Sequence, residues 1–289
     1  MDVSVIIVNY NTKKLTMDCI RSVLQSKTRY AYEIILVDNA SADGTADAVE
    51  AAFPAVKLIR NDRNAGFSKA NNQGIRIAAG RYILLLNSDT VVEPETLERM
   101  VEYMDRHPEV GASGCKLVLP DGSLDEACKR GFPTPKAAFY YAFGFSKRHP
   151  HDPKYNQYKL THLHPDEIHE VDCLVGAFML VRKEAIDEVG LLDEEFFMYG
   201  EDIDWCYRIK QAGWKIMYVP VTTVIHYKGA SSRKKPFRIV YEFHRAMILF
   251  HRKHYRRIYP AWINGLVYLG VFVKFVAALG ASRIGAARD

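Results

Sequence analysis

The sequence predicts an α/β fold in which a mainly parallel β-sheet is flanked by helices, and three observations lead to this fold class. Four short apolar runs alternate with helical segments along the first 90 residues. Each run is apolar throughout, which is typical of strands that are buried on both faces. The chain has 289 residues, of which 48% are hydrophobic, so it is long enough to bury a core without disulfide or metal cross-links.

The elements of the first half follow one another at short intervals. Residues 3–8 form the first expected strand, after which Leu15, Cys19 and Val23 recur at helical spacing. Further strands are expected over residues 33–37, 56–60 and 81–86, with helices between them over residues 46–53 and 68–79. This alternation predicts parallel strands joined by crossover helices.

The second half is less regular. Residues 120–170 are rich in proline, histidine and aromatic residues and are expected to form a long, partly mobile insertion. A helix is expected to begin near Glu201 and to end at Gly213, because acidic residues suit a helix N-terminus and glycine suits its end. The other expected elements are helices over residues 95–106 and 183–189 and strands over residues 173–182, 215–219 and 224–226.

Each of the four N-terminal strands is followed by asparagine or aspartate. These residues are Asn9 and Asn11, Asp38 and Asn39, Asn61 and Asn64, and Asn87 and Asp89. Both residue types are ordinary in turns, so any single loop is equally well explained by turn formation. Ligands of open α/β sheets bind beyond the carboxyl ends of the strands, and four polar ends at that edge favour a binding site.

The charge is unevenly distributed along the chain. The net charge is +5, of which residues 228–260 carry +9 and residues 261–289 carry +2, so that residues 1–227 carry −6. An acidic body with a basic segment indicates a localised anionic partner and argues against a nucleic-acid-binding protein. The five cysteines are odd in number and contain no CxxC pair, which argues against a disulfide framework and fits a reducing compartment.

Three positions have the chemistry of a catalytic site. Asp89 follows a buried strand and can bind a hard divalent cation that neutralises a diphosphate. Glu201 and Asp202 follow aromatic residues. Aromatic surroundings partly desolvate a carboxylate and raise its pKa toward that of a general base. The alternative is that these acids only cap the N-terminus of a helix. His226 is a candidate metal ligand, although a lone histidine is more often structural. No GxGxxG, GxxxxGK[ST] or GxSxG motif occurs.

The C-terminal segment suggests contact with a membrane. Basic and aromatic residues alternate over residues 233–257, and residues 261–281 are apolar apart from Asn264 and Lys274. At 1.5 Å per residue this apolar run reaches about 32 Å, barely a membrane span. We therefore expect residues 233–281 to lie on an anionic membrane surface, with a solvated basic face and a core or dimer helix as the alternative. Asp2 and the short apolar run after it do not fit a signal peptide.

Taken together, these motifs resemble family 2 glycosyltransferases of the GT-A fold, in the branch of bacterial rhamnosyltransferases of surface polysaccharide and cell-wall assembly. The resemblance covers roughly residues 2–230. It rests on VIIVNYN at residues 5–11, VDNASADGT at 37–45, NxxNxGF at 61–67, LNSDT at 86–90, Gly176-Ala177, and FFMYGEDID at 196–204.

The resemblance implies inverting transfer from a nucleotide-diphosphate sugar, with dTDP-rhamnose as the expected donor and UDP-glucose, UDP-galactose or UDP-GlcNAc as the alternative. Residues 87–89 occupy the position of the family's DXD motif, with asparagine in place of the first aspartate. Asp89 and His226 would hold Mg²⁺ or Mn²⁺. The residues implied in nucleotide-sugar binding are Asn9, Tyr10, Asn11, Asp38, Asn39, Asn61, Gly66, Asn71, Asn87, Ser88 and Asp89.

The resemblance also assigns the acceptor side. Asp202 matches the catalytic base of the family, with Glu201 beside it. Gly176 and Ala177, together with the insertion, would face a lipid-linked or saccharide acceptor. Trp205 would either stack on a sugar or pack in the core. The expected location is the cytoplasmic face of the plasma membrane.

These expectations divide the chain into a catalytic domain, residues 1–230, and a helical C-terminal extension, residues 231–289. Residues 1–100 would bind the nucleotide sugar and residues 101–230 would supply the acceptor and catalytic half. A nucleotidyltransferase would need a glycine-rich loop after the first strand, where residues 9–12 contain no glycine. A non-catalytic, membrane-docked carbohydrate-binding scaffold would be expected to lack Asp89 or Asp202, and both are present.

Overall fold

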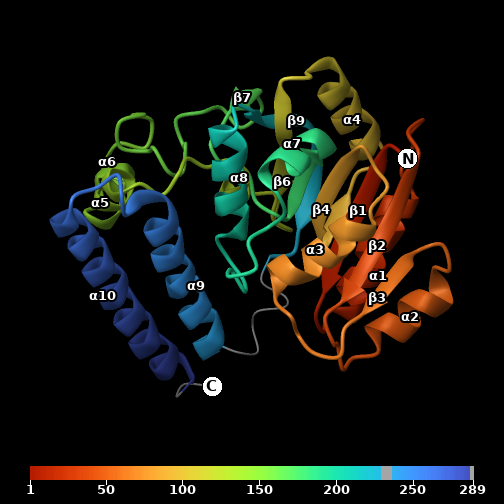
Figure 1. Cartoon of the computed structure of the whole chain (residues 1–289), viewed down its shortest axis with the longest axis horizontal. Coiled ribbons are helices and arrows are strands. Elements are labelled where there is room, and N and C mark those ends of the chain that lie inside the picture. The colour runs from red at the N-terminus through yellow and green to blue at the C-terminus, as the bar shows by residue number, and fades with distance from the viewer. Residues whose placement is uncertain (229–235, 287–289) are drawn as a thin grey trace.

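The structure is a computed structural model that describes residues 1–228 and 236–286. A mixed β-sheet lies at its centre, in the strand order β3-β2-β1-β4-β8-β6-β9-β5, with β7 paired to β9 (Figure 1). The strands are β1 (Val3–Asn9), β2 (Tyr32–Asp38), β3 (Lys57–Arg60), β4 (Tyr82–Asn87), β5 (Thr90–Val92), β6 (Val110–Val118), β7 (His169–Glu170), β8 (Phe178–Arg182) and β9 (Lys215–His226).

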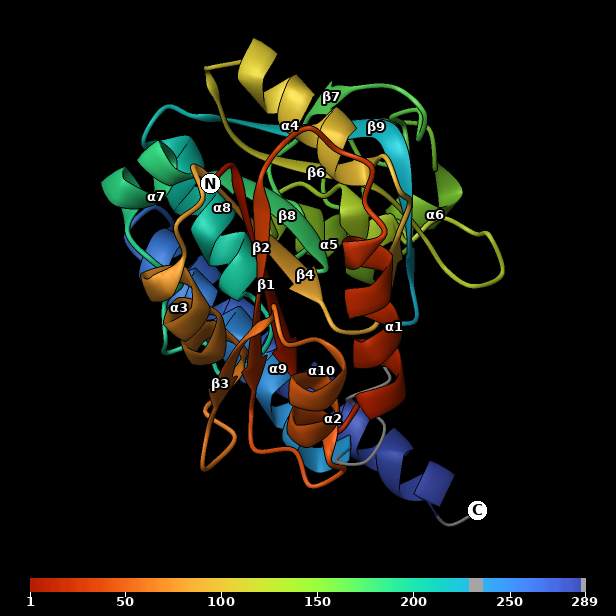
Figure 2. The same ribbon diagram turned by 90° about the vertical axis from the view of Figure 1, so that its right-hand side faces the viewer.

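Helices cover both faces of this sheet. Figure 2 shows α3, α7 and α8 on one face and α1 on the other. The helices are α1 (Lys13–Leu24), α2 (Thr45–Ala52), α3 (Phe67–Ile77), α4 (Thr96–Arg106), α5 (Pro135–Ala142), α6 (Phe145–Arg148), α7 (Lys183–Val189), α8 (Glu201–Gln211), α9 (Pro236–Phe250) and α10 (Ala261–Ala286), with a 3₁₀ turn at Glu126–Cys128 and a π-helical turn at His251–Tyr255.

The parallel arrangement predicted for the first four strands is confirmed. β1 pairs in parallel with β2 and β4, and β2 pairs in parallel with β3. The rest of the sheet is mixed, because β8 runs antiparallel to both β4 and β6. Phe178, the first residue of β8, lies opposite Leu86 near the end of β4, so this strand enters the sheet from the carboxyl edge. Residues 173–177, which were expected to extend the strand, form a loop at that edge.

The register of the parallel strands brings their polar ends together. Asn9 lies opposite Asp38, and Val8 lies opposite Asn87. The strands themselves are anchored by completely buried side chains such as Ile6 and Ile7. Both faces of the sheet are closely packed, and a shift of one residue would exchange the side chains of the two faces and disrupt their packing. Core packing therefore also aligns the ends that carry the candidate site.

The insertion at residues 120–170 contains the two short helices α5 and α6 and otherwise irregular turns. Aromatic side chains hold it together: Tyr140 packs edge-on against Tyr155 with ring centroids 5.0 Å apart, and Phe145 stacks on Tyr155 at 5.7 Å. Such pairs add stability beyond the burial of their surface. The segment therefore has a small apolar centre of its own.

The C-terminal helices α9 and α10 pack side by side as a hairpin at one end of the molecule (Figure 1). The apolar run predicted at residues 261–281 is helical within α10. By length and composition, Ala261–Gly280 could cross a membrane, and only 11% of it is buried in the structure. Arg233, Lys234 and Lys235, which belong to the predicted basic segment, lie outside the described residues.

Asp204 in the first turn of α8 joins the hairpin to the part of the molecule that contains the sheet. Its carboxylate is completely buried and accepts hydrogen bonds from Arg208 Nε at 2.8 Å and His254 Nε2 at 2.7 Å, with Lys253 Nζ also at 2.7 Å. Burial opposes ionisation, but the hydrogen bond from His254 and the charges of Arg208 and Lys253 lower the pKa of Asp204 to about 2. Phe196 and Ala246 pack in a second apolar cluster at the same junction.

Replacing Asp204 with asparagine removes the carboxylate that these cationic groups share. We expect Asp204→Asn to lower the free energy of unfolding by about 3–5 kcal/mol, because the remaining charges lose their buried partner. Asp47→Asn is a matched control, since this 80% exposed carboxylate pairs with Arg60 on the surface and its loss should cost about 1 kcal/mol or less. Urea denaturation compares the two, and equal small losses would contradict the structural role of Asp204.

The same pair of proteins should differ in acid. The folded-state pKa of Asp204, about 2, lies below the ordinary value of 3.8, so its stabilising contribution is complete above about pH 4 and is lost as the pH falls toward 2. Thermal unfolding of the wild type should therefore become more like that of Asp204→Asn as the pH is lowered through this range. A constant difference between the two proteins would contradict the assignment.

Candidate active site

The carboxyl ends of β1 and β2 are joined by the side chain of Asn9. It donates to Asp38 Oδ1 and to Ser41 Oγ, both at 2.8 Å, and its carbonyl oxygen accepts from Thr12 Oγ1 at 2.6 Å. Asn9 is completely buried and Asp38 is 3% exposed. Of these two predicted binding residues, Asn9 serves to shape the loops, whereas Asp38 also reaches a cavity.

That cavity, of about 310 Å³, lies at the carboxyl ends of β2 and β3 and is lined by polar groups that include Asp38, Ser41, Arg60 and Asn61. Its volume is within the usual range of small-molecule sites, roughly 300–1,000 Å³. Carboxylate, hydroxyl and amide groups in one cavity can exchange hydrogen bonds with the base and ribose of a nucleoside. The structure therefore places Asp38 and Asn61, two of the predicted residues, at one polar cavity.

Asn39 organises the loop after β3. Its amide oxygen accepts from Asn61 Nδ2 and from the Ala65 backbone, both at 3.0 Å, and its amide nitrogen donates to the Gly66 carbonyl at 3.2 Å. Gly66 has φ +91°, and a side chain there would approach the carbonyl oxygen of Phe197 to 2.8 Å. Glycine is required at this position because the loop before α8 presses directly against it.

The remaining predicted residues at this edge have different surroundings. Tyr10 is half-buried, and Asn11 is exposed with φ 54° and accepts a hydrogen bond from the Ala42 backbone at 2.8 Å. Asn71 is buried in α3 and donates to the Phe67 carbonyl at 2.9 Å, one turn earlier. Its side chain therefore stabilises the start of α3 in this structure.

Asp89 and His226 are brought together at the end of β4. His226 Nε2 lies 3.4 Å from Asp89 Oδ1, while its other ring nitrogen, Nδ1, lies 2.9 Å from Asp125 Oδ2. All three residues are buried. Burial disfavours the charged ring, but hydrogen bonds to Asp125 and Asp89 raise the pKa of His226 to about 9. Lys228 Nζ donates to the second oxygen of Asp125 at 2.7 Å.

These groups fit part of the coordination sphere of a divalent cation. A carboxylate and an imidazole are suitable ligands, and a second carboxylate on the far ring nitrogen is the usual way in which a metal-binding histidine is oriented. Asn87 Oδ1 is buried without a hydrogen-bond partner nearby, and Ser88 Oγ lies 3.1 Å from Thr12 Oγ1. Among the described residues, no group of three or more His, Cys, Asp or Glu side chains forms a metal cluster, so water molecules or a bound diphosphate would complete the coordination of a cation here.

Asp202 pairs with a buried arginine. Arg130 Nη2 donates to Asp202 Oδ2 at 2.6 Å and to the Leu174 carbonyl at 2.6 Å. Burial opposes the charge of Arg130, but the Asp202 carboxylate raises the pKa of the guanidinium above its ordinary value. Asp202 also lies in the first turn of α8, where the helix dipole favours a negative charge. The carboxylate is therefore held next to a buried cationic partner.

Glu201, next to it, is in a different electrostatic environment. Its Oε2 atom is buried without a hydrogen-bond partner. Burial and the neighbouring charge of Asp202 raise the pKa of Glu201 to about 8. In the first turn of α8, a carboxyl group with a raised pKa thus lies next to one that pairs with an arginine.

The structure corrects the expectations for the acceptor side. Trp205 is completely buried and its indole nitrogen donates to the Gly190 carbonyl at 2.9 Å, so the sugar-stacking interpretation is wrong and the core interpretation is right. Ala177 is also completely buried, and its carbonyl accepts from the Asn87 backbone at 3.1 Å. Gly176 is buried beneath the Phe67 ring. Both lie beside the site but present no side-chain surface to an acceptor.

Sequence reasoning missed Asp125 and Arg130. Both lie at the start of the insertion, where irregular composition gave no motif or periodicity to single them out. Asp125 contacts His226 and Arg130 contacts Asp202, so one short segment touches both halves of the candidate site. Five residues span at most roughly 18 Å when fully extended, and here they include a 3₁₀ turn, which keeps the two pairs close together.

Residues 4–190 match the family model described as glycosyl transferase family 2. An N-acetylglucosaminyl-diphospho-decaprenol L-rhamnosyltransferase of Mycobacterium tuberculosis is 30% identical over 239 residues, which are 78% of this chain and 76% of that protein. Rhamnosyltransferase WbbL of Escherichia coli K12 is 31% identical over 183 residues, which are 60% of this chain and 66% of that protein.

Two solved structures show the same fold. Mannosyltransferase PcManGT from Pyrobaculum calidifontis, in complex with GDP-Man and Mn²⁺, has a TM-score of 0.59 at 17% identity and covers 99% of this chain and 79% of that one. GalNAc-T7 with UDP, GalNAc and Mn²⁺ has a TM-score of 0.58 at 20% identity, covering 78% of this chain and 44% of that one. The predicted GT-A fold is thus confirmed, and the chain is a glycosyltransferase that belongs to glycosyl transferase family 2.

Proposed function

We propose that this enzyme transfers rhamnose from dTDP-rhamnose to a lipid-linked or saccharide acceptor, with inversion at the anomeric carbon, in the synthesis of a bacterial surface polysaccharide or cell wall. The observation that carries the proposal is the segment from Asp125 to Arg130, which contacts His226 at one end and Asp202 at the other. This segment links His226, which is suited to bind a cation on the leaving diphosphate, with Asp202, which is suited to deprotonate the acceptor.

In the proposed reaction, Asp202 accepts the proton of an acceptor hydroxyl. The oxygen of that hydroxyl bonds to the anomeric carbon of the sugar while the bond from this carbon to the diphosphate breaks. Arg130 orients the Asp202 carboxylate before the acceptor arrives. A divalent cation bound at Asp89 and His226 would neutralise the charge that develops on the departing diphosphate. Glu201, neutral at pH 7, excludes water from the base and adds no second negative charge.

The nucleotide part of the donor is assigned to the polar edge of the sheet. We place the base and ribose in the cavity beside Asp38 and Asn61, with the backbone of the Asn39 and Gly66 loop close by. The rhamnosyltransferase names of two relatives support rhamnose as the sugar. A UDP-sugar is the alternative, since the structural neighbour GalNAc-T7 contains UDP.

The acceptor is assigned to a membrane surface. The decaprenol-linked substrate in the name of the mycobacterial relative supports a lipid-linked acceptor. α10 exposes Trp262, Leu266, Leu269 and Phe272, each more than half accessible, although the helix packs against α9. We propose that α10 lies in the membrane interface on the cytoplasmic side, which would bring the catalytic domain to such an acceptor. A non-catalytic carbohydrate-binding scaffold is the more distant alternative.

A donor screen tests the function directly. Purified full-length protein is incubated with dTDP-rhamnose, UDP-glucose, UDP-galactose, UDP-GlcNAc or GDP-mannose, with Mn²⁺, Mg²⁺ or EDTA. We expect slow hydrolysis of dTDP-rhamnose that requires a divalent cation. Selective hydrolysis of a UDP-sugar would replace rhamnose by the alternative donor, and a protein that binds none of them would contradict the catalytic assignment.

The two acidic residues of α8 should respond differently to amide substitution. Asp202→Asn should lower transfer by about 10²–10⁴-fold, because the base is lost. Glu201→Gln copies the shape of a protonated carboxyl group and should retain most of the activity at pH 7. Steady-state kinetics with the donor from the screen measure both, and a Glu201→Gln defect as large as that of Asp202→Asn would contradict these roles.

Asp125 should act through the metal site. Asp125→Asn leaves His226 without its orienting carboxylate and should raise the Mn²⁺ concentration needed for half-maximal turnover by about 10–100-fold. Asp166→Asn is the matched control, because this exposed carboxylate pairs only with Lys116. An unchanged Mn²⁺ requirement in Asp125→Asn would show that His226 does not serve a metal.

Membrane contact is tested by flotation with vesicles. Full-length protein should float with phosphatidylglycerol vesicles, and Leu266→Asn should weaken binding by about tenfold or more, because each buried leucine contributes about 1.5–3 kcal/mol. Leu24→Asn removes a leucine that is 42% exposed on α1 and should have no effect. If the wild type stays in the soluble fraction, or if Leu266→Asn and Leu24→Asn float equally well, α10 does not contact the membrane.

A further inference from the structure

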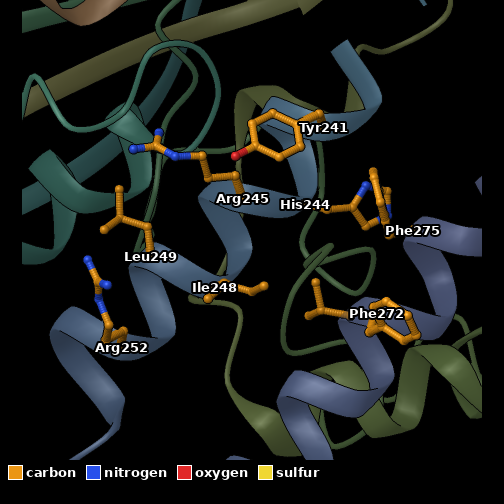
Figure 3. Close-up of a pocket in the computed structure, with 9 residues that line it drawn as sticks. Tyr241, His244, Arg245, Ile248, Leu249, Arg252, Phe272 and Phe275 are labelled. Carbon is orange, nitrogen blue, oxygen red and sulfur yellow. The ribbon is translucent and has the colours of Figure 1, made fainter. Parts of the chain in front are cut away.

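A groove between α9 and α10 has no part in the chemistry described so far. Its volume is about 320 Å³, close to the lower end of small-molecule sites, roughly 300–1,000 Å³. The walls are mostly apolar and come from both helices (Figure 3): Tyr241, Ile248 and Leu249 from α9, and Val271, Phe272 and Phe275 from α10. An apolar groove of this size can hold part of a hydrocarbon chain.

Two arginines lie at the edge of this groove. Arg245 and Arg252 both line it (Figure 3), and both contact Glu195 in the loop before α8. Arg245 Nη1 donates to the Glu195 carbonyl at 2.6 Å and lies 3.6 Å from Glu242, and Arg252 Nη2 lies 3.4 Å from the Glu195 carboxylate. Their side chains remain 38% and 57% exposed. Exposed ion pairs of this kind are weak, so an incoming anion can take the place of the Glu195 carboxylate.

The charged edge adjoins the catalytic end of α8. Phe243 of α9 packs edge-on against Tyr199 at 5.7 Å, and a side chain on Gly200 would lie 3.3 Å from Ala246 Cβ. Tyr199 and Gly200 directly precede Glu201 and Asp202. A molecule whose anionic head rests on the arginines would thus have that head beside the helix that carries the base.

We propose that this groove binds the isoprenoid chain of a polyprenyl-diphosphate acceptor next to its head, with Arg245 and Arg252 pairing with the diphosphate. The inference rests on the proposed function and names its acceptor subsite. An apolar groove with two guanidinium groups at one edge matches an amphiphile with a doubly charged head, and arginine forms paired hydrogen bonds to phosphate oxygens. The rest of the chain would lie in the bilayer along the exposed face of α10.

Two pairs of matched variants test the groove. Val271→Phe fills it, whereas Val273→Phe makes the same change at a residue of α10 that is 57% exposed and does not line it. Arg252→Gln removes a positive charge at the edge of the groove, whereas Arg256→Gln removes a positive charge from the nearby exposed turn. The substrates are GlcNAc linked through diphosphate to decaprenol and the same head group carrying a methyl group in place of the isoprenoid chain. Circular dichroism and thermal unfolding establish that each variant is folded.

We expect Val271→Phe to raise the KM for the decaprenyl acceptor about tenfold relative to the methyl acceptor, as is usual for lost apolar pocket contacts. Arg252→Gln should raise the KM for both acceptors, because both carry the diphosphate. Val273→Phe and Arg256→Gln should change neither. Excess phosphatidylglycerol in the detergent should not compete with the decaprenyl acceptor.

The inference is overturned if each variant behaves like its matched control, if phosphatidylglycerol competes as well as the acceptor does, or if the wild type uses both acceptors equally. In these cases the protein still transfers sugar, so the proposed function stands. A wild type that neither hydrolyses any nucleotide sugar nor glycosylates either acceptor would instead contradict the proposed function itself.

Discussion

The first turn of α8 carries two buried carboxylates that hold different parts of the protein. Asp202 pairs with Arg130 from the insertion, and Asp204 pairs with Arg208, Lys253 and His254, the last two from the C-terminal hairpin. Buried charges are stable only when they are paired, so each carboxylate requires its partners to stay in place. The insertion and the hairpin are thereby positioned relative to the helix that faces the end of the sheet.

The electrostatic arrangement of the site follows from which acids have cationic partners. Asp202 has Arg130, and Asp125 has His226 and Lys228, so hydrogen bonds hold the pKa of Asp125 below its ordinary value despite its burial. Glu201 has no such partner, and its raised pKa keeps it neutral. In the proposed reaction, Asp202 is the base on the acceptor side, and Asp89 and His226 bind a cation on the side of the leaving diphosphate. A single displacement requires these two roles.

Much of the sheet and its polar edge could be predicted, because both depend on local patterns. Continuous apolar runs predict parallel buried strands, and their register brings Asn9, Asp38 and Asn87 to one edge. Whether such a residue faces a ligand or its neighbours depends on packing, as the buried Asn9 and Trp205 show. Arg130 could not be predicted, because its partner Asp202 lies 72 residues away and no motif joins them.

The central claim is that Asp202 acts as a base and not as a nucleophile, so that the sugar moves to the acceptor in one displacement. The configuration of the new glycosidic bond tests this most directly. The product formed from dTDP-β-L-rhamnose is isolated and the configuration at its anomeric carbon is determined by NMR. The account predicts an α-linked rhamnose. A β-linked product would mean retention of configuration and would contradict it.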